Sequence, residues 1–452
     1  MTATRVNQPL DNYELEDRYR RESGRVFLTG TQALVRIPLM QRAMDAAAGL
    51  NTAGFISGYR GSPLGAYDIE LWRASRHLEE RNIRFLPAVN EELAATAILG
   101  SQQVEGDPAS DVDGVFGIWY GKGPGVDRAG DGLKHGNAYG SSPHGGVLVI
   151  AGDDHGCVSS SMSHQSDVAF LTWLMPNLNP ASVAEYLAFG LYGLALSRFS
   201  GMWVGFKAIS ETVESAMSVE LPPYPQFVMP ADFEPPPDGL HIRWPDYPGP
   251  QIEERLEYKK AATLAFAEAN PIDRKIFDTP DARYGIVTTG KGHLDLMEAL
   301  RLLGIDRREA HRIGLDVYKV GMVWPLAHDS ALDFVRGKHE VLVVEEKRGL
   351  IESQFKEYFY DYPGKKPRRM VGKEDQHGNK LVPWTGELSP IQLARIVAAR
   401  LDAEFTGLGL TGRARALERG ETPRIEITGA SRIPYFCSGC PHNTSTKVPD
   451  GS

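Results

Sequence analysis

Cysteine is scarce in this chain: there are 3 cysteines among 452 residues. So few cysteines cannot form the disulfide framework of a small secreted domain, so we expect a reducing compartment, the cytoplasm. Long apolar runs are missing as well. The most apolar stretch, residues 187–196, is too short to cross a bilayer and predicts a buried helix. The first residues are polar and charged, unlike a secretory signal.

The chain also lacks an excess of positive charge. Its net charge of -9 argues against nucleic acid and against an anionic membrane surface as partners. A hydrophobic content of 42% and a charged content of 24% are those of an ordinary globular protein with a substantial core. The length is enough for about two or three domains.

Short apolar runs alternate with helical stretches, which predicts an α/β fold with parallel sheets and crossover helices. Proline is dense between residues 221 and 250, and such a segment predicts an extended linker between two domains. The expected segments are a polar N-terminal arm (1–24), a first α/β domain (25–220), a proline-rich linker (221–280), a smaller second α/β domain (281–405) and a connector (406–452). The expected strands are residues 54–57, 82–87, 115–119, 146–150, 202–206, 284–289 and 340–344.

Glu91 opens a run of small apolar residues that follows an extended apolar run, residues 84–89. Interpreted as strand, cap and helix, this pattern places a carboxylate at the carboxyl edge of a sheet, where open α/β sheets bind ligands. Asn90 is also a good helix N-cap, and acidic residues favour the positive end of a helix dipole. An ordinary helix start is therefore the simpler interpretation of these residues alone.

Three polar or glycine-rich loops follow expected strands and would meet Glu91 at one sheet edge. They span residues 57–65, 120–127 and 151–167. Their glycines let the backbone approach a ligand closely. One such loop is more often a plain turn than a site, but three beside a helix-opening glutamate favour a site. Their candidate side chains are Arg60, Ser62, Lys122, Asp127, His155 and His164.

Motifs in the first domain resemble those of the 2-oxoacid:ferredoxin oxidoreductases, particularly the indolepyruvate branch. The run Tyr59–Pro63 (YRGSP) is similar to that family's Tyr-Pro-Gly-Thr-Pro loop. Asn90 and Glu91, with Gly100 further on, are similar to the helix that carries its glutamate for thiamine diphosphate. The strand and loop around residues 146–167 resemble the family's next strand and loop.

The resemblance continues in the same order along the chain. Residues 286–290, 321–326 and 341–346 resemble the family's transketolase C-terminal-like domain. Residues 437–442 (CSGCPH) resemble the Cys-Pro-Gly-Cys-Pro-His sequence that leads into its pyrophosphate-binding domain. An ordered set of this kind is far more specific than any single motif.

The resemblance implies a fold, a cofactor and a reaction. The fold is a parallel-sheet domain for the pyrimidine end of thiamine diphosphate, followed by a smaller transketolase C-terminal-like α/β domain. The reaction is oxidative decarboxylation of an aryl pyruvate such as indolepyruvate to an acyl-CoA, with ferredoxin as electron acceptor. The implied partners are the 2-oxo acid, CoA, ferredoxin, a pyrophosphate-binding domain in cis or on another subunit, and a second copy in a homodimer.

The family motifs also imply roles for single residues. Glu91 would bond the cofactor's aminopyrimidine ring. Ser62, in place of the family threonine, would bond the substrate carboxylate or keto oxygen, and Arg60, in place of a proline, would add a charge-assisted bond. The implied cofactor-binding residues are Glu91, Gly61, Lys122, Gly123, Cys440 and His442.

The chain stops soon after His442, so we expect the diphosphate and its Mg2+ to be held by a pyrophosphate-binding domain that is not in this sequence, and the isolated chain to be inactive. Gly130–Gly132 imitates the start of a diphosphate motif, but no apolar strand precedes it and no asparagine follows at the usual distance, so no metal ligand is assigned. An iron–sulfur cluster needs about four thiolates, so none is expected here.

Two other functions stay open. Residues 287–292 form a strand–glycine–helix pattern that suits a phosphate of a nucleotide or CoA at a helix N-terminus, although the match to the dinucleotide pattern is incomplete. The chain could also be a non-catalytic two-domain fragment. The sequence does not decide which 2-oxo acid is used, or whether Lys122, Asp127, His155 and His164 take part.

Overall fold

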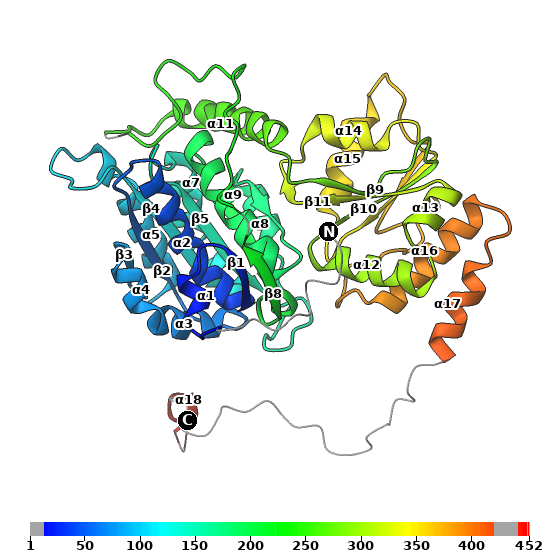
Figure 1. Ribbon diagram of the computed structural model, residues 1–452, viewed down its shortest axis with the longest axis horizontal. Helices are drawn as coiled ribbons and strands as arrows, with labels where there is room; N and C mark the ends of the chain where they lie inside the picture. The colour runs from blue at the N-terminus through cyan, green and yellow to red at the C-terminus, as the bar shows by residue number, and fades with distance from the viewer. Residues whose placement is uncertain (1–12, 222, 244, 420–441, 450, 452) are drawn as a thin grey trace.

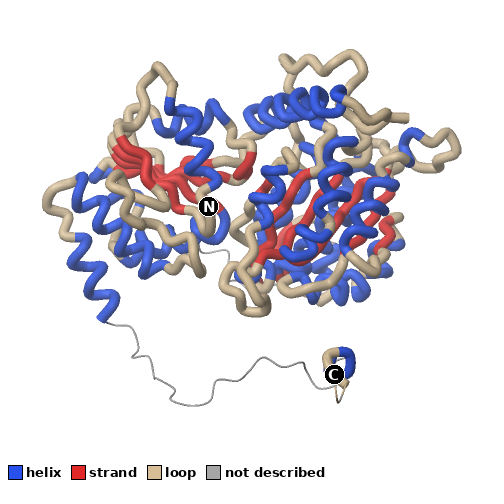
Figure 2. Tube along the Cα trace, turned by 180° about the vertical axis from the view of Figure 1, so that it is seen from behind, coloured by secondary structure: helices blue, strands red, loops and turns tan. Residues whose placement is uncertain are grey.

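The computed structural model describes residues 13–221, 223–243, 245–419, 442–449 and 451. They form two α/β domains, each built on its own sheet (Figure 1). Seen from behind, the strands of the two sheets lie in separate lobes flanked by helices (Figure 2). The predicted fold class, one parallel-sheet α/β domain followed by a smaller α/β domain, is confirmed. In the part of the chain described, no helix is both long enough and apolar enough to cross a membrane.

The first domain contains a seven-stranded sheet that is parallel except for β12. In spatial order its strands are β12 (Met322–Trp324), β6 (Asn177–Leu178), β7 (Val204–Ile209), β5 (Val147–Asp153), β4 (Val115–Lys122), β2 (Ala53–Gly58) and β3 (Ile83–Phe85). β12 comes from the second domain by sequence and pairs antiparallel with β6. The two domains are therefore joined through one edge of this sheet.

Helices cover both faces of the first sheet. Because successive side chains of a strand point to opposite faces, Ile118 and Leu148 pack on one side, and Trp119 and Val149 on the other. A sheet buried on both faces has almost continuously apolar strands, which is why these strands are visible in the sequence. The first face carries α2 (Gly30–Ala47), α3 (Tyr67–Arg73) and α9 (Val183–Ser200), and the second carries α5 (Glu91–Ser101), α6 (Gly123–Arg128), α7 (Gly130–Tyr139) and α8 (Ser166–Thr172).

The second domain contains a five-stranded sheet. In spatial order its strands are β14 (Arg369–Val371), β13 (Glu340–Val344), β10 (Tyr284–Thr289), β11 (Leu315–Val320) and β9 (Arg274–Phe277), with β9 antiparallel. One face packs against α12 (Gly290–Leu302), α13 (Arg307–Ile313), α16 (Pro390–Glu404) and α17 (Leu410–Arg419), and the other against α14 (His328–Val335) and α15 (Leu350–Tyr360).

The described part of the N-terminal segment is integrated into the first domain, which corrects the prediction of an arm over residues 1–24. It contains α1 (Asp17–Arg20), and β1 (Gly24–Thr29) pairs antiparallel with β8 (Ala216–Leu221). The Tyr19 ring is buried, and its hydroxyl donates to Glu70 at 2.9 Å. Burial of one large ring with its hydroxyl satisfied outweighs the charge of the surrounding residues.

The proline-rich linker is shorter than the predicted range 221–280. Described residues between 223 and 249 contain no helix or strand, as the prolines predict. Beyond them lies α11 (Pro250–Ala269), whose Phe266 packs into the core of the first domain beside α9. The last proline of the dense run, Pro250, occupies the first helical position, where its fixed φ and missing N–H are tolerated. Proline there begins a helix rather than extending a linker.

The predicted connector, residues 406–452, also needs correction at its start. α17 packs against α16, and its Leu410 and Ala414 are buried in the core of the second domain. The second domain therefore extends to at least residue 417. Cys437 and Cys440 lie outside the described residues. The short helix α18 (His442–Ser445) follows them in the sequence.

Candidate functional site

The three predicted loops meet at one edge of the first sheet, because β2, β4 and β5 are parallel and end there. Lys122 Nζ, at the end of β4, donates to the Ser159 carbonyl at 2.9 Å. Ser159 Oγ in turn donates to Ser62 Oγ at 2.8 Å. Gly61 lies against Lys122: a Cβ added to this glycine would lie 3.1 Å from Lys122 Cβ. The loops are thus joined by side chains from all three strand ends.

Glu91 is the first residue of α5, directly after the predicted cap. The Asn90 side chain accepts from the Leu93 N–H at 2.8 Å, and Trp119 Nε1 donates to the Glu91 carbonyl at 2.9 Å. These two bonds fix the first turn of α5 against β4. The simpler interpretation, an ordinary helix start, therefore explains the role of Asn90. It does not explain the position of the Glu91 side chain.

The Glu91 carboxylate is partly buried and is paired only through a long contact with Arg128. Its side chain is 13% exposed, and its ion-pair partner, Arg128 Nε, is 4.0 Å away, too far for a hydrogen bond. Among the described residues, none donates a hydrogen bond to this carboxylate. Most buried polar groups in folded proteins are hydrogen-bonded, so an unpaired carboxylate is a group with unused binding capacity.

Gly125 in the second loop makes room for this carboxylate. A Cβ at Gly125 would lie 2.5 Å from Glu91 Oε1, closer than any real contact of this kind. Any side chain at position 125 would therefore displace the Glu91 carboxylate from its present position. The structure places Glu91 beside the second loop. Among the described residues, neither Ser62 nor Arg60 forms a hydrogen bond to Glu91.

His164 joins the second loop to the third. Its Nε2 lies 2.8 Å from an Asp127 oxygen, and its Nδ1 lies 3.3 Å from the buried carboxylate of Asp153. Burial opposes protonation, but the bonds to Asp153 and Asp127 raise the pKa of His164 to about 9. The Gly123 Cα is close to the ring, since a Cβ there would lie 2.3 Å from His164 Cγ. A charged imidazolium thus anchors the start of α6.

Arg60 lines a cavity of about 250 Å3 between the first loop and the end of β3. Trp72 on α3 and Tyr59 give this cavity two partly exposed aromatic rings. Burial raises the pKa of Asp68 at the same cavity, and the positive charge of Arg60 opposes that rise. Arg60 therefore lies where a guanidinium, a carboxylate and aromatic surfaces face a common space.

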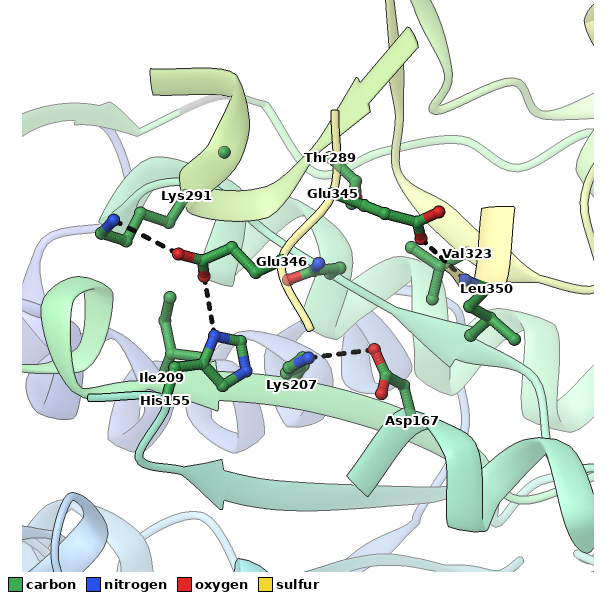
Figure 3. A pocket seen from close by; sticks show the side chains of 12 residues that line it. His155, Asp167, Lys207, Ile209, Thr289, Lys291, Val323, Glu345, Glu346 and Leu350 are labelled. Carbon is green, nitrogen blue, oxygen red and sulfur yellow. Dashed lines mark hydrogen bonds and ion pairs between the residues drawn. The ribbon is translucent and has the colours of Figure 1, made fainter. Parts of the chain in front are cut away.

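The corresponding edge of the second domain is closed. Lys291 follows Gly290 at the start of α12, and Figure 3 shows it with Glu346, Lys207 and Asp167 around a small interdomain cavity. Lys291 Nζ donates to Asp295 at 2.7 Å and to the Leu388 carbonyl at 2.8 Å, and lies 3.4 Å from Glu346. The cavity has a volume of about 10 Å3, room for about one water molecule.

This geometry bears on the nucleotide or CoA interpretation of residues 287–292. The lysine that would meet a phosphate is neutralised by two carboxylates of its own domain. Gly290 faces the first domain, since a Cβ there would lie 2.5 Å from the Asn179 side-chain oxygen. A phosphate at this helix start would have to displace the domain interface, so the turn is a structural contact.

His155, which the sequence left undecided, belongs to this interface as well. Its Nδ1 lies 2.7 Å from Glu346 Oε2, and both side chains are almost fully buried. Burial raises the pKa of a carboxyl, but the hydrogen bond from His155 outweighs it and lowers the pKa of Glu346 to about 2. Sequence reasoning missed Gly125, Ser159 and Glu346. The only available signals were the glycines and serines of the loops and the acidic pair after β13.

The two remaining predicted cofactor-binding residues, Cys440 and His442, lie at the limit of the described residues. Cys440 is outside the described residues, and of His442 only its position at the start of α18 is known. Their role remains a prediction from the family motif.

The fold is similar to that of a 2-oxoacid:ferredoxin oxidoreductase. The solved 2-oxoglutarate:ferredoxin oxidoreductase from Magnetococcus marinus, with 2-oxoglutarate, coenzyme A and succinyl-CoA bound, superposes with a TM-score of 0.59. The match covers 84% of this chain and 66% of that chain at 14% identity, which shows a common fold. The α/β two-domain architecture, expected from the motifs, is thus supported by an independent comparison.

Sequence comparisons then point to the indolepyruvate branch. Residues 274–421 match the family model described as "Indolepyruvate oxidoreductase domain". The indolepyruvate oxidoreductase subunit IorA of Pyrococcus abyssi is 24% identical over 308 residues, 67% of this chain and 44% of that protein. IorA of Methanothermobacter thermautotrophicus is 24% identical over 443 residues, 95% of this chain and 61% of that protein. The resemblance to 2-oxoacid:ferredoxin oxidoreductases, and to their indolepyruvate branch, is confirmed, and the chain spans about half the length of these relatives.

Proposed function

We propose that this chain supplies the pyrimidine-binding and transketolase C-terminal-like domains of a thiamine-diphosphate-dependent 2-oxoacid oxidoreductase. The observation that supports the proposal is the Glu91 carboxylate at the carboxyl edge of the first sheet, which is partly buried and has no hydrogen-bond donor among the described residues. Its position on the first turn of α5 is the one that the family motif assigns to the cofactor-activating glutamate. The relatives named above are oxidoreductases of 2-oxo acids or subunits of them, and this similarity supports an oxidoreductase activity on a 2-oxo acid.

The residues around Glu91 fit the aminopyrimidine end of the cofactor. The carboxylate would accept a proton-sharing bond from a ring nitrogen, which is favoured where water is excluded. Gly125 keeps one side of the Glu91 carboxylate free of a side chain. The hydrogen bond from Trp119 Nε1 to the Glu91 carbonyl fixes the first turn of α5. When bound, thiamine diphosphate supplies the carbanion stabilisation that decarboxylation needs. The diphosphate and Mg2+ would be held by a pyrophosphate-binding domain, with Cys440 and His442 near that end.

Ser62 and Arg60 are suited to the 2-oxo acid. Because Ser62 Oγ accepts a hydrogen bond from Ser159, its own proton is free to be donated to a substrate carboxylate or keto oxygen. Arg60 adds a positive charge for the carboxylate. The aromatic rings of Tyr59 and Trp72 beside it support an aryl side chain such as that of indolepyruvate.

The remaining partners of the proposed reaction are CoA, ferredoxin and a second copy of the chain. Oxidative decarboxylation releases two electrons, for which ferredoxin is the acceptor, and CoA receives the acyl group. The scarcity of cysteine supports a cytoplasmic location and iron–sulfur clusters on another domain or subunit.

Substitution of Glu91 tests this function directly in the enzyme assembled with its pyrophosphate-binding domain. Glu91→Gln removes the proton-sharing carboxylate at nearly constant volume, so turnover of the 2-oxo acid should fall by about 10²–10⁴. Glu92→Gln is the matched control, because Glu92 is exposed on the same helical turn. Acceptor reduction by both variants gives the comparison. Equal turnover of Glu91→Gln and wild type would refute the assignment.

A second test uses direct binding. Isothermal titration with thiamine diphosphate and Mg2+ should show strong binding only when the pyrophosphate-binding domain is supplied to this chain. Tight binding of CoA or NADH by the chain alone, with no binding of thiamine diphosphate in either case, would favour the nucleotide-binding alternative. No binding of any of them would favour the non-catalytic fragment.

A further inference from the structure

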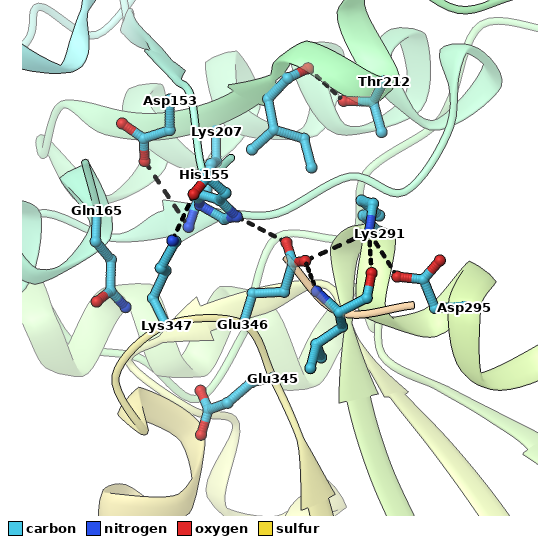
Figure 4. Close-up of polar contacts among 12 residues, drawn as sticks. Asp153, His155, Gln165, Lys207, Thr212, Lys291, Asp295, Glu345, Glu346 and Lys347 are labelled. Carbon is cyan, nitrogen blue, oxygen red and sulfur yellow. Dashed lines mark hydrogen bonds and ion pairs between the residues drawn. The ribbon is translucent and has the colours of Figure 1, made fainter. Parts of the chain in front are cut away.

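One segment of the second domain contacts the third loop of the first domain at both of its ends. We call residues 154–165 the serine loop and residues 345–348, which follow β13, the clamp segment. At the start of the serine loop, Glu346 bonds His155 Nδ1 at 2.7 Å and Lys347 Nζ donates to the His155 carbonyl at 2.6 Å. Figure 4 shows both contacts between the two domains.

At the other end, the Gln165 side chain bonds the backbone of Arg348 in both directions. Gln165 Oε1 accepts from the Arg348 N–H at 3.1 Å, and Gln165 Nε2 donates to the Arg348 carbonyl at 3.3 Å. A side-chain amide that pairs with both backbone groups of one residue fixes position and orientation together. The two ends of the serine loop are thus held by three consecutive residues that follow one strand, Glu346, Lys347 and Arg348.

The clamp segment is itself rigid. Glu345 accepts hydrogen bonds from the N–H groups of Leu350, Ile351 and Glu352, which anchors the segment to the first turn of α15. Lys347 has a φ of 57°, a left-handed conformation that is uncommon for a residue other than glycine. Backbone in this region persists where surrounding contacts determine it, and such residues concentrate at functional sites.

Between its anchored ends, the serine loop is largely exposed. Val158 and Met162 have more than half of their surface in solvent, and Cys157 is exposed too. Within this exposed part lie the contacts that reach the candidate site, namely Ser159 with Ser62 and His164 with Asp127. The Asp154 carboxylate orders the first turn of the loop by accepting from the N–H groups of Val158 and Ser159 at 2.9 and 2.8 Å. Because the loop has few buried apolar contacts, the position of this turn over Ser62 depends in addition on how the ends of the loop are held.

We propose that the clamp segment positions the serine loop for the reaction, so that Glu346, Lys347 and Gln165 orient the Ser159 hydroxyl toward Ser62. They are positioning residues: they act through the serine loop and touch neither substrate nor cofactor. This inference rests on the proposed function for its catalytic consequence. The order of the serine loop, however, can be measured without the cofactor.

General adhesion between the domains is the competing explanation, and the chain offers a control for it. Glu185 on α9 and Lys319 on β11 form another ion pair between the two domains, and neither touches the serine loop. Glu185→Gln should therefore weaken the interface without releasing the loop. Glu346→Gln and Gln165→Ala should release it, each from one end.

Hydrogen–deuterium exchange of the 452-residue chain is the first experiment. Amides of residues 156–164 should exchange about tenfold faster in Glu346→Gln and in Gln165→Ala, the effect of losing one buried hydrogen bond, while Glu185→Gln leaves them unchanged. Unfolding midpoints of all variants show whether each one folds. Unchanged exchange in folded Glu346→Gln and Gln165→Ala, or equal acceleration in Glu185→Gln, would overturn the proposal.

Kinetics of the assembled enzyme form the second experiment. Gln165→Ala should raise KM for the 2-oxo acid about tenfold with a smaller change in kcat, because Ser62 contacts the substrate rather than the cofactor. Loop release without any change in KM would contradict the positioning role. If Glu91→Gln kept full turnover while exchange responded as expected, the proposed function would fail and the mechanical clamp would stand.

Discussion

The carboxyl edges of the two sheets have the same local architecture, but the charged side chains at these edges differ in how they are paired. In each, a helix begins at the end of a strand and places a charged side chain on its first turn, Glu91 on α5 and Lys291 on α12. Both side chains are 13% exposed. Lys291 has two carboxylates and a carbonyl around it, whereas the nearest cation to Glu91 is 4.0 Å away.

The difference shows that burial alone does not mark a ligand site. A buried charge that is paired and hydrogen-bonded belongs to the architecture, because its desolvation is already offset by its partners. A partly buried charge that lacks a hydrogen-bond donor keeps unused binding capacity, and at a sheet edge the group that would use it is expected to be a ligand. The comparison therefore assigns binding to the first edge and domain association to the second.

After the loss of the carboxylate itself, the largest expected effect comes from filling the space beside Glu91. Gly125→Ala places a methyl group 2.5 Å from Glu91 Oε1, so the carboxylate must move. A displacement of this size should lower turnover of the assembled enzyme by about 10²-fold. Gly65→Ala in the first loop is the control, since a Cβ there meets no atom within 4 Å. Similar activity of the two variants would remove the distinction between the two edges.

A smaller effect is expected at the carboxyl edge of the second domain's sheet, and it is an effect on stability. Lys291→Met leaves Asp295 and Glu346 with one partner fewer and should lower the free energy of unfolding by about 2 kcal/mol, with cofactor affinity unchanged. Lys275→Met is the control, because its ion pair with Asp333 is exposed and should contribute less than about 1 kcal/mol. Urea unfolding measures both variants. Loss of thiamine diphosphate binding in Lys291→Met would mean that this edge is part of the site.

The smallest effect is a pH dependence at His164. Its pKa is about 9 in the folded chain and about 6.5 when unfolded, so its ion pairs stabilise the fold fully below pH 6.5 and lose that effect as pH rises toward 9. The loss should be about 1 kcal/mol, reduced by the exposure of Asp127. His164→Gln should flatten the stability profile between pH 6 and 9. Parallel profiles for the variant and the wild type would show that His164 is not charged.

Much of the fold could be predicted because the sheets are buried on both faces. The strands around residues 115–119 and 284–289 are buried along their whole length and mostly apolar, and the convergence of three loops at one edge follows from parallel strands. The end of the linker was misplaced because Pro250 serves as a helix start. The clamp could not be predicted, since His155 and Glu346 are 191 positions apart and only the packed domains bring them together.

The sequence indicates which residues belong to the site, but it does not indicate which of them contact one another. Asn90 and Glu91 indicate a helix start. The surroundings of the Glu91 carboxylate depend on Gly125 and Arg128, which both lie on α6. His155 and His164 look equivalent in the sequence. The structure places the first against the second domain and the second between two loops of the first domain.

A structure of the assembled enzyme with thiamine diphosphate bound tests the central claim most directly. The account predicts a Glu91 carboxylate oxygen within about 2.6–3.2 Å of a nitrogen of the aminopyrimidine ring, with Lys291 still paired to Asp295 and Glu346. A cofactor ring bound elsewhere, with Glu91 turned to Arg128 or to solvent, would contradict it.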